Sequence, residues 1–391
     1  MYCFKMNEEK MKELSCFWTA TEIAQQPSTW SKTLDQIESL KEELKAFIAQ
    51  VTAHEDFDVI LTGAGTSEFV GNSICLHLNR LLGNKVRSIG TTDLVSAPED
   101  YFYKEKPTLL ISYARSGNSP ESVGAVEAAE VVCEHVYHLM ITCNKNGALS
   151  KFAKTNDHSF ALNLADETCD QSFAMTSSYT NMDLACVLCF HMDELDVLRQ
   201  QMSQVIDNGQ KFIDEGYETV EKIIEEFDFK RIVYLGANDL KGTAQESALK
   251  MLELTAGQVV TMFDSPLGFR HGPKSIVNDE TLTVILLSSN PYARQYEMDL
   301  LKEMSGQRKG NRIVVLCAQK CEEALELADY VVCYNHECAL DNALLGLNYI
   351  LFAQVLALKK SLSLSIGPDN PCPTGEVNRV VKGVTIYPYQ K

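Results

Sequence analysis

Three charged side chains recur at helical spacing between Ala244 and Glu253. Glu246 and Lys250 are four residues apart, and Glu253 follows three residues later. All three therefore fall on one stripe of a helix, with the Glu–Lys pair in the stabilising order. A carboxylate beside an ammonium can move a proton and stabilise the negative charge that the transfer creates. A solvated, salt-bridged helix face would show the same spacing, so the pattern alone leaves both alternatives open.

An imidazole follows eighteen residues after Glu253, in His271-Gly272-Pro273. Histidine can take up and return a proton near neutral pH. The remaining histidines form no HxH or HExxH pattern, so the sequence predicts no metal site. Cys186 and Cys189 form a CxxC pattern inside an apolar helical segment without a second pair, which favours core packing over zinc binding.

Two small, hydroxyl-rich segments each follow a buried-strand pattern and precede a helix. The first is Gly63-Ala64-Gly65-Thr66-Ser67 and the second contains Arg115-Ser116-Gly117-Asn118-Ser119. Glycine allows close backbone approach, and hydroxyl and N–H donors at a helix start suit a compact anion. The sequence therefore predicts phosphate ligands, which are Thr66, Ser67, Arg115, Ser116 and Ser119. Each segment alone could be a tight strand-to-helix turn, but two on adjacent strands favour binding.

The motifs favour a small phosphorylated ligand over a nucleotide. No GxxxxGK[ST] P-loop occurs, and the first segment lacks the third glycine of a dinucleotide fingerprint. Asp170 and Ser177 precede or open a helix in the same half of the chain, where sugar hydroxyls could be held. An ordinary helix cap is the alternative for both.

The elements that must position these groups come in two similar sets. Three strand-like segments recur at offsets of 173, 175 and 177 residues, which are 58–63 with 231–236, 108–112 with 283–287, and 136–141 with 313–317. Near-constant offsets indicate a duplicated domain. Strands alternate with helices in each half, so the fold class is α/β, with two tandem doubly wound parallel-sheet domains. Such sheets bind ligands at the carboxyl ends of their strands.

The pattern divides the chain into five parts. We predict a helical N-terminal arm at 1–50, a first αβ domain at 51–195 with the phosphate loops, a connecting helix at 196–228, a second αβ domain at 229–365 with the charged helix, and a C-terminal tail at 366–391. Proline and glycine in the tail exclude a long regular element there.

The amino-acid composition limits which binding partners and which cellular compartment we expect. The 391 residues include 35 Lys and Arg against 53 Asp and Glu, a formal charge of −18, which disfavours nucleic acid and membranes as partners. The N-terminus is charged, and no run of eighteen apolar residues occurs, so we expect neither a signal peptide nor a membrane span. Thirteen cysteines in a chain this long indicate buried free thiols. We expect a cytoplasmic protein without a cofactor.

With these residues in view, the chain resembles the sugar isomerase (SIS) superfamily, and specifically the bacterial tagatose-6-phosphate ketose/aldose isomerase and galactosamine-6-phosphate deaminase family. The shared motifs span nearly the whole chain and include GAGTSEF, RSGNSPES, AQESALKMLELTAG, DSPLGFRHGPKS and GEVNRVV. The resemblance implies two flavodoxin-like, three-layer αβα domains and a small-molecule sugar phosphate as the substrate.

The resemblance also implies roles, by comparison with the isomerase half of glucosamine-6-phosphate synthase. Ser67, Arg115, Ser116 and Ser119 would hold the phosphate. Lys250 and Glu253 match the lysine and the proton-transferring glutamate, and His271 matches a ring-opening histidine supplied by the neighbouring subunit. A homodimer or higher oligomer with composite sites is therefore expected. The synthase's closing C-terminal lysine has no match, and Asn378 or Arg379 would take its place.

The expected reaction moves a proton from C2 to C1 of an aldohexosamine 6-phosphate, converting galactosamine 6-phosphate into tagatose 6-phosphate and ammonia. Glu253 would be the base, and Lys250 would stabilise charge on the sugar oxygen. Simple aldose–ketose isomerisation of a neutral hexose 6-phosphate is the alternative. A non-enzymatic sugar-phosphate sensor is a third possibility, but such regulators carry a DNA-binding module, and the chain shows no basic helix-turn-helix pattern.

Overall fold

The computed structural model describes residues 2–337, 340–381 and 383–390, which divide into two compact units. The first-sheet unit comprises Ser28–Asp170, Ser177–Arg199 and the described residues from Val377 onward. The second-sheet unit comprises the described residues up to Pro27, Gln171–Thr176 and the described residues of Gln200–Glu376. Met1 and Lys391, the outer limits of the predicted arm and tail, lie outside the described residues.

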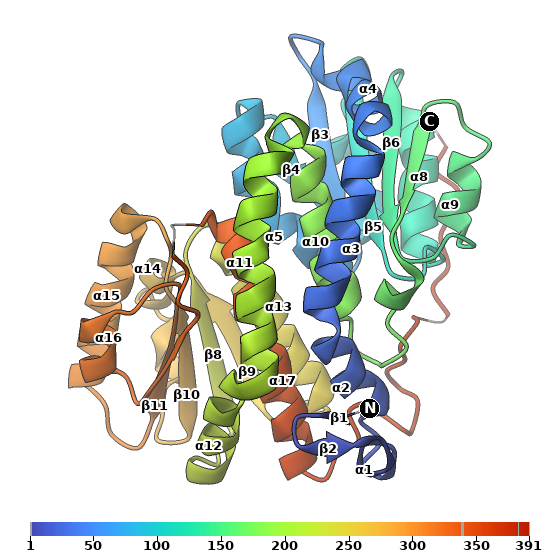
Figure 1. Ribbon diagram of the computed structural model, residues 1–391. Helices are drawn as coiled ribbons and strands as arrows, with labels where there is room; N and C mark the ends of the chain where they lie inside the picture. Colours follow the sequence, from blue (N-terminus) through green and yellow to red (C-terminus); the bar gives the residue numbers. More distant parts are fainter. Residues whose placement is uncertain (1, 338–339, 382, 391) are drawn as a thin grey trace. The chain divides into compact units, whose positions relative to one another are not determined.

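The first-sheet unit contains a five-stranded parallel sheet of order β4-β3-β5-β6-β7 (Figure 1). Its strands are β3 (Asp58–Thr62), β4 (Val86–Ser88), β5 (Thr108–Ala114), β6 (Val136–Thr142) and β7 (Ser159–Asn163). Its helices are α3 (Gln26–Ser39), α4 (Lys41–Thr52), α5 (Thr66–Leu82), α6 (Thr91–Ser96), α7 (Pro98–Tyr101), α8 (Pro120–Val132), α9 (Ala148–Ala153), η1 (Asp166–Thr168), α10 (Ser177–Cys189) and η2 (Met192–Glu194).

Strand β5 shows why this sheet is a central layer. All seven of its residues are buried, as expected of a strand covered on both faces. Leu110 belongs to a core cluster with Val126 of α8, whereas the hydroxyl of Tyr113 donates a hydrogen bond to Cys186 of α10. Because side chains alternate along a strand, α8 and α10 cover opposite faces.

The second-sheet unit contains a parallel sheet of order β12-β11-β10-β8-β9. Its strands are β8 (Arg231–Gly236), β9 (Val260–Asp264), β10 (Thr281–Leu286), β11 (Arg312–Cys317) and β12 (Tyr330–Cys333). The other elements are β1 (Tyr2–Cys3), β2 (Met6–Asn7), α1 (Glu8–Glu13), α2 (Phe17–Ala24), η3 (Phe212–Gly216), α12 (Glu218–Glu226), α13 (Asp239–Leu254), α14 (Pro266–Phe269), η4 (Pro273–Ile276), α15 (Pro291–Gly306), α16 (Glu322–Leu327) and α17 (Asn342–Ser363). Helix α11 (Leu195–Lys211) begins in one unit and ends in the other.

The two sheets have the same connectivity. In each, the first strand along the chain lies between the second and the third, and the fourth and fifth follow outward. The strands paired in the sequence, β3 with β8, β5 with β10 and β6 with β11, occupy equivalent positions. The predicted fold class, two doubly wound parallel sheets flanked by helices, is confirmed.

The compact units do not follow the five predicted parts. The predicted arm at 1–50 divides at Pro27, and the predicted connecting helix at 196–228 consists of most of α11, the π-helical turn η3 and α12. The tail from Val377 packs in the first-sheet unit, where the hydroxyl of Tyr389 bonds to Glu99. Tertiary contacts between distant segments decide this division.

Helix α17 is long and apolar enough to cross a membrane by composition, but 94% of its apolar window is buried inside the protein. It is a core helix, since Asp341 caps its start and α13 packs along it. Cys186 and Cys189 are also fully buried, as predicted. The twelve described cysteines are free thiols, and Cys338 lies outside the described residues.

Candidate active site

Helix α13 begins directly after β8 through a tight turn. A side chain at Gly236 would collide with the backbone oxygen of Leu240, 2.2 Å from the position of its Cβ. Asn238, just before the helix, has φ +56°, a left-handed conformation that asparagine tolerates better than most residues. The turn therefore starts α13 at the carboxyl end of β8, which is the ligand-binding edge in sheets of this kind.

The three charged residues of α13 lie mostly inside the protein. Glu246 and Lys250 are 0% exposed, and the side chain of Glu253 is 24% exposed. Lys250 Nζ lies 2.5 Å from Glu253 Oε2 and 3.2 Å from Glu246 Oε1. The alternative of a solvated helix face is therefore wrong. These groups form a buried ion cluster with one accessible carboxylate.

The charge state of this cluster follows from its composition. Burial acts to lower the pKa of Lys250, but the adjacent Glu246 and Glu253 outweigh burial and raise it. The ammonium therefore remains protonated and holds Glu253 in one orientation. A fixed, accessible carboxylate backed by a buried cation can exchange a proton with a bound ligand.

His271 lies on a different segment of the same unit, between α14 and η4. It is exposed, and its imidazole makes no hydrogen bond to any residue that the structure describes. Its backbone N–H donates to the carbonyl of Gly268 at 2.9 Å. The structure therefore does not join His271 to Lys250 or Glu253 of the same chain by a hydrogen bond.

The first predicted phosphate segment lies between β3 and α5. A side chain at Gly63 would meet the backbone of Ser67 at 2.4 Å, and Gly65 has φ +57° just before the helix. Thr66 and Ser67 open α5 and are nearly buried. Two hydroxyls at the positive end of a seventeen-residue helix suit a small anion.

The second predicted phosphate segment follows β5, the sheet neighbour of β3, with Thr62 opposite Ser112. Arg115 is 7% exposed. Ser119 caps α8 by accepting from the N–H of Ser122 and donating to its hydroxyl at 2.6 Å. The two phosphate segments thus leave adjacent strands at the same edge of one sheet, as the sequence predicted.

The equivalent turns of the second-sheet unit do not suit an anion. Asp239 opens α13 where Thr66 opens α5, and it is buried. After β10, the N–H of Ser288 is bonded to Glu297 at 2.8 Å and that of Ser289 to Asn342 at 3.0 Å. Carboxylates and internally bonded amides would disfavour phosphate here, whereas the turns of the first sheet carry no such groups at the positions of Asp239 and Glu297.

The four candidates for contact with the sugar or for closing the site have different environments. Asp170 and Ser177 are fully buried, and the Asp170 carboxylate caps α10 by accepting from the N–H groups of Ser177 and Ser178. Arg379 and Asn378 are exposed in the tail. The backbone oxygen of Arg379 accepts from Arg115 at 2.6 Å, and its guanidinium donates to the Asp170 carbonyl. The structure thus brings Arg115, Asp170 and Arg379 together, with Asp170 in the role of a helix cap.

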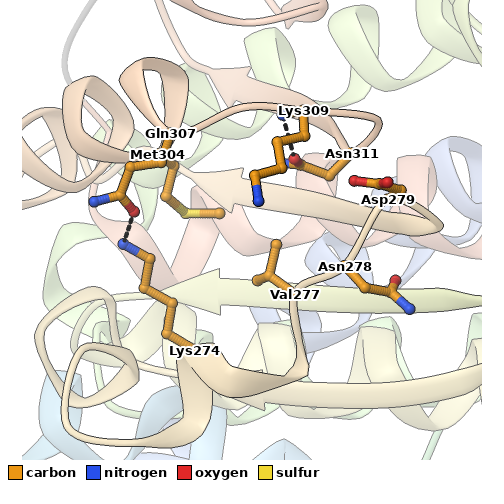
Figure 2. A pocket seen from close by; sticks show the side chains of 8 residues that line it. All are labelled: Lys274, Val277, Asn278, Asp279, Met304, Gln307, Lys309 and Asn311. Atoms are coloured by element: carbon orange, nitrogen blue, oxygen red, sulfur yellow. Dashed lines mark hydrogen bonds between the residues drawn. The ribbon is translucent and has the colours of Figure 1, made fainter.

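A cavity of about 550 Å³ lies at the amino ends of β10 and β11, lined by Lys274, Lys309, Asn311 and others (Figure 2). It lies at the opposite ends of the strands from the start of α13, so it is not at the predicted ligand-binding end of the sheet.

Two carboxylates that lie near the candidate groups were not identified from the sequence. Glu303 on α15 has no motif around it, and Asp239 could be identified only by aligning the two strand-to-helix turns.

Comparison with known proteins shows the family to which this chain belongs. Residues 54–192 and 227–358 match the SIS domain. The chain is 43% identical over 389 residues, 99% of this chain and 96% of the relative, to D-galactosamine-6-phosphate deaminase AgaS of Shewanella sp. (strain ANA-3). It is 42% identical to D-galactosamine-6-phosphate deaminase AgaS of Escherichia coli, over 95% and 96% of the two chains.

Among solved structures, tagatose-6-phosphate ketose/aldose isomerase from Escherichia coli superposes with a TM-score of 0.88 at 40% identity, over 96% of this chain and 97% of that one. A Clostridium novyi protein provisionally described as a tagatose-6-phosphate ketose/aldose isomerase superposes with a TM-score of 0.97 at 46% identity, over 100% of both chains. These likenesses confirm the family to which the motifs pointed.

Proposed function

This chain belongs to the SIS domain family, and we propose that it is a deaminase that converts galactosamine 6-phosphate into tagatose 6-phosphate and ammonia. The observation that carries the proposal is the ion cluster of α13, in which buried Lys250 orients the accessible carboxylate of Glu253 at 2.5 Å. The proposed substrate is supported by relatives that match nearly the whole chain and are named as D-galactosamine-6-phosphate deaminases.

In this proposal the substrate phosphate binds to the first-sheet unit. Thr66 and Ser67 would donate their hydroxyls, and Ser116 would donate from the neighbouring strand end. Ser119, whose hydroxyl bonds to Ser122 in this structure, would turn that hydroxyl toward the phosphate. Arg115, which is nearly buried, would supply a cation for this anion in a chain that is acidic overall. Its bond to the Arg379 carbonyl links the tail to the same guanidinium, so Arg379 and Asn378 would close over the bound phosphate.

The reaction itself would take place at Glu253. The carboxylate removes the proton from C2 of the open-chain amino sugar and returns it to C1. Lys250 is fully buried between two carboxylates, so we assign it to orienting Glu253 rather than to direct contact with a sugar oxygen. Glu246 completes the cluster as the second counter-ion of Lys250.

Protonation at C1 yields an imine at C2. Addition of one water to that imine and loss of the nitrogen as ammonia then gives the ketose phosphate, so one aldosamine phosphate and one water balance one ketose phosphate and one ammonia. His271 would transfer the proton that opens the pyranose ring. Because its imidazole is exposed and forms no hydrogen bond to the described residues, it is available to a neighbouring subunit, as composite sites in a cytoplasmic homodimer require.

Aldose–ketose isomerisation is a second candidate, favoured by the names of the two structural neighbours. The first proton transfer is the same for a neutral hexose 6-phosphate, and the two activities diverge only when nitrogen leaves C2. Glu253 would serve both reactions.

The decisive test measures ammonia and sugar products with purified protein. Galactosamine 6-phosphate should release stoichiometric ammonia, and Glu253→Gln should lower kcat by about 10² to 10⁴-fold while leaving substrate binding intact. Glu323→Gln, which removes an exposed ion pair with Lys302, is the control. Interconversion of galactose 6-phosphate and tagatose 6-phosphate without any ammonia from the amino sugar would replace the deaminase with the isomerase.

A further inference from the structure

The segment that carries His271 runs from the carboxyl end of β9 to the amino end of β10. It leaves β9 at Asp264, forms α14 and η4, and enters β10 at Thr281. Between the two short helices, Gly272 has φ +118°, a conformation that other residues rarely adopt. The imidazole of His271 forms no hydrogen bond to the described residues, so its direction depends on the backbone of the turn around it.

One carboxylate on α15 holds both sides of that turn. Glu303 Oε2 lies 3.0 Å from a guanidinium nitrogen of Arg270, and Glu303 Oε1 accepts from the ammonium of Lys274. Arg270 directly precedes His271, and Lys274 follows three residues after it. The turn is therefore bound at two points to one side chain of a sixteen-residue helix.

The residue that directly follows α15 strengthens one of these contacts. Gln307, four residues after Glu303 and at the C-terminal end of the helix, accepts from Lys274 Nζ at 2.6 Å. Figure 2 shows Lys274 reaching toward Gln307 at the wall of the cavity. Lys274 lowers the pKa of Glu303, and Arg270 adds to the effect, so the carboxylate stays charged at neutral pH.

We propose that Glu303 is a positioning residue for the reaction, because it holds Arg270 and Lys274 and so fixes the turn that presents His271. The inference rests on the proposed ring-opening role of His271. It assigns Glu303 no contact with substrate. Phe269, which is fully buried in the core beside α15, anchors the start of the turn independently, so loss of the Glu303 contacts loosens residues 270–274 without unfolding the unit.

This arrangement differs from an ordinary surface ion pair. Isolated exposed pairs contribute little, because water competes for both partners. Here one carboxylate joins two cations of the same short turn, and the three side chains are only 23 to 34% exposed. Lys302 of α15 and Glu323 of α16, with both side chains about half exposed, form an ordinary pair and provide the matched control.

The test compares Glu303→Gln, Glu303→Asp and Glu323→Gln in the full-length protein with galactosamine 6-phosphate. We expect Glu303→Gln to lower kcat by about tenfold with little change in KM, as a small misplacement of a reacting group does. Hydrogen exchange at the amides of residues 271–275 should accelerate in this variant. Glu303→Asp, which keeps the charge, should recover much of the rate, and Glu323→Gln should match the parent in both measurements.

A double-mutant cycle distinguishes positioning from general destabilisation. If Glu303 acts through His271, then Glu303→Gln should cost nothing further in a His271→Ala background. An equal cost in both backgrounds would overturn the proposal. If His271→Ala has no measurable turnover, the proposal is tested by the hydrogen-exchange rates and by the activity that Glu303→Asp recovers. Unchanged exchange rates in Glu303→Gln, or no recovery of activity in Glu303→Asp, would overturn the proposal.

The same variants separate this inference from the proposed function. A His271→Ala variant with parental kcat would remove the ring-opening role and with it the basis of the inference. A strongly impaired His271→Ala beside a fully active Glu303→Gln would leave the proposed function intact and reject Glu303 alone.

Discussion

The ammonium of Lys250 lies 2.5 Å from Glu253 and 3.2 Å from Glu246, and both Lys250 and Glu246 are inaccessible to solvent. Removing one partner of a buried ion cluster leaves an uncompensated charge. We therefore expect Lys250→Met to lower the free energy of unfolding by about 3 to 5 kcal/mol, measured by urea denaturation. The double variant Glu246→Gln/Lys250→Met should recover part of that loss, and no recovery would contradict the pairing.

Arg115 is expected to contribute to substrate affinity rather than to proton transfer. A hydrogen bond to a charged group is worth about 1.5 to 3 kcal/mol, so Arg115→Gln should raise KM by roughly 10 to 100-fold with a smaller effect on kcat. Steady-state kinetics would show the division. Lys145→Gln, which removes an exposed pair with Asp166 in the same unit, should leave KM unchanged, and an equal rise in this control would mean a non-specific charge effect.

Glu297 should make stability depend on pH. Burial raises the pKa of Glu297 to about 7, against the opposing effects of the Ser288 N–H and Arg294. Between the ordinary carboxyl pKa of about 4.5 and 7, the folded protein binds more protons than the unfolded chain, so this residue makes stability fall as pH rises. Its contribution over that window is about 3 kcal/mol.

The comparison is Glu297→Gln with the parent protein in urea denaturation at pH 5 and pH 8. The variant should gain stability relative to the parent at pH 8, because glutamine remains neutral there. An identical pH dependence in the two proteins would contradict the raised pKa. Glu323→Gln, exposed on the surface, should follow the parent at both pH values.

Cys333 should be the most reactive described thiol. It lies opposite Cys317 on the adjacent strand, and the Cys317 side chain lowers the pKa of Cys333 from its usual value, against the effect of burial. A lowered pKa favours the thiolate, so alkylation of Cys333 by iodoacetamide should be faster at pH 7 than at pH 5. Burial raises the pKa of Cys186 to about 12, so that thiol should resist labelling.

Mass spectrometry of tryptic peptides would measure the labelling rates. The variant Cys333→Ser should lose the fast-reacting site while the remaining cysteines keep their rates. If the fastest label appeared instead on Cys372, in the exposed loop after α17, exposure rather than thiolate formation would govern reactivity.

Local sequence determined much of the fold. The two sets of strands, the capped start of α8 at Ser119 and Pro120, and the helix beginning at Asp341 follow from periodicity and cap chemistry that act over a few residues. The phosphate segments were recognisable for the same reason, since glycines and hydroxyls between a strand and a helix require no distant contact. The candidate residues of α13 were identified by spacing and family likeness.

Only the tertiary structure decided which of those charges are buried and what the unremarkable residues do. The pattern of Glu246, Lys250 and Glu253 fits a wet surface as well as a buried cluster, and the choice depends on α17 and the sheet packing around α13. Glu303 is separated from Arg270 by 33 residues, and Arg379 from Arg115 by 264. Such pairs arise because folding brings distant chain segments within hydrogen-bond distance. The local sequence of either segment does not indicate which segment it will contact.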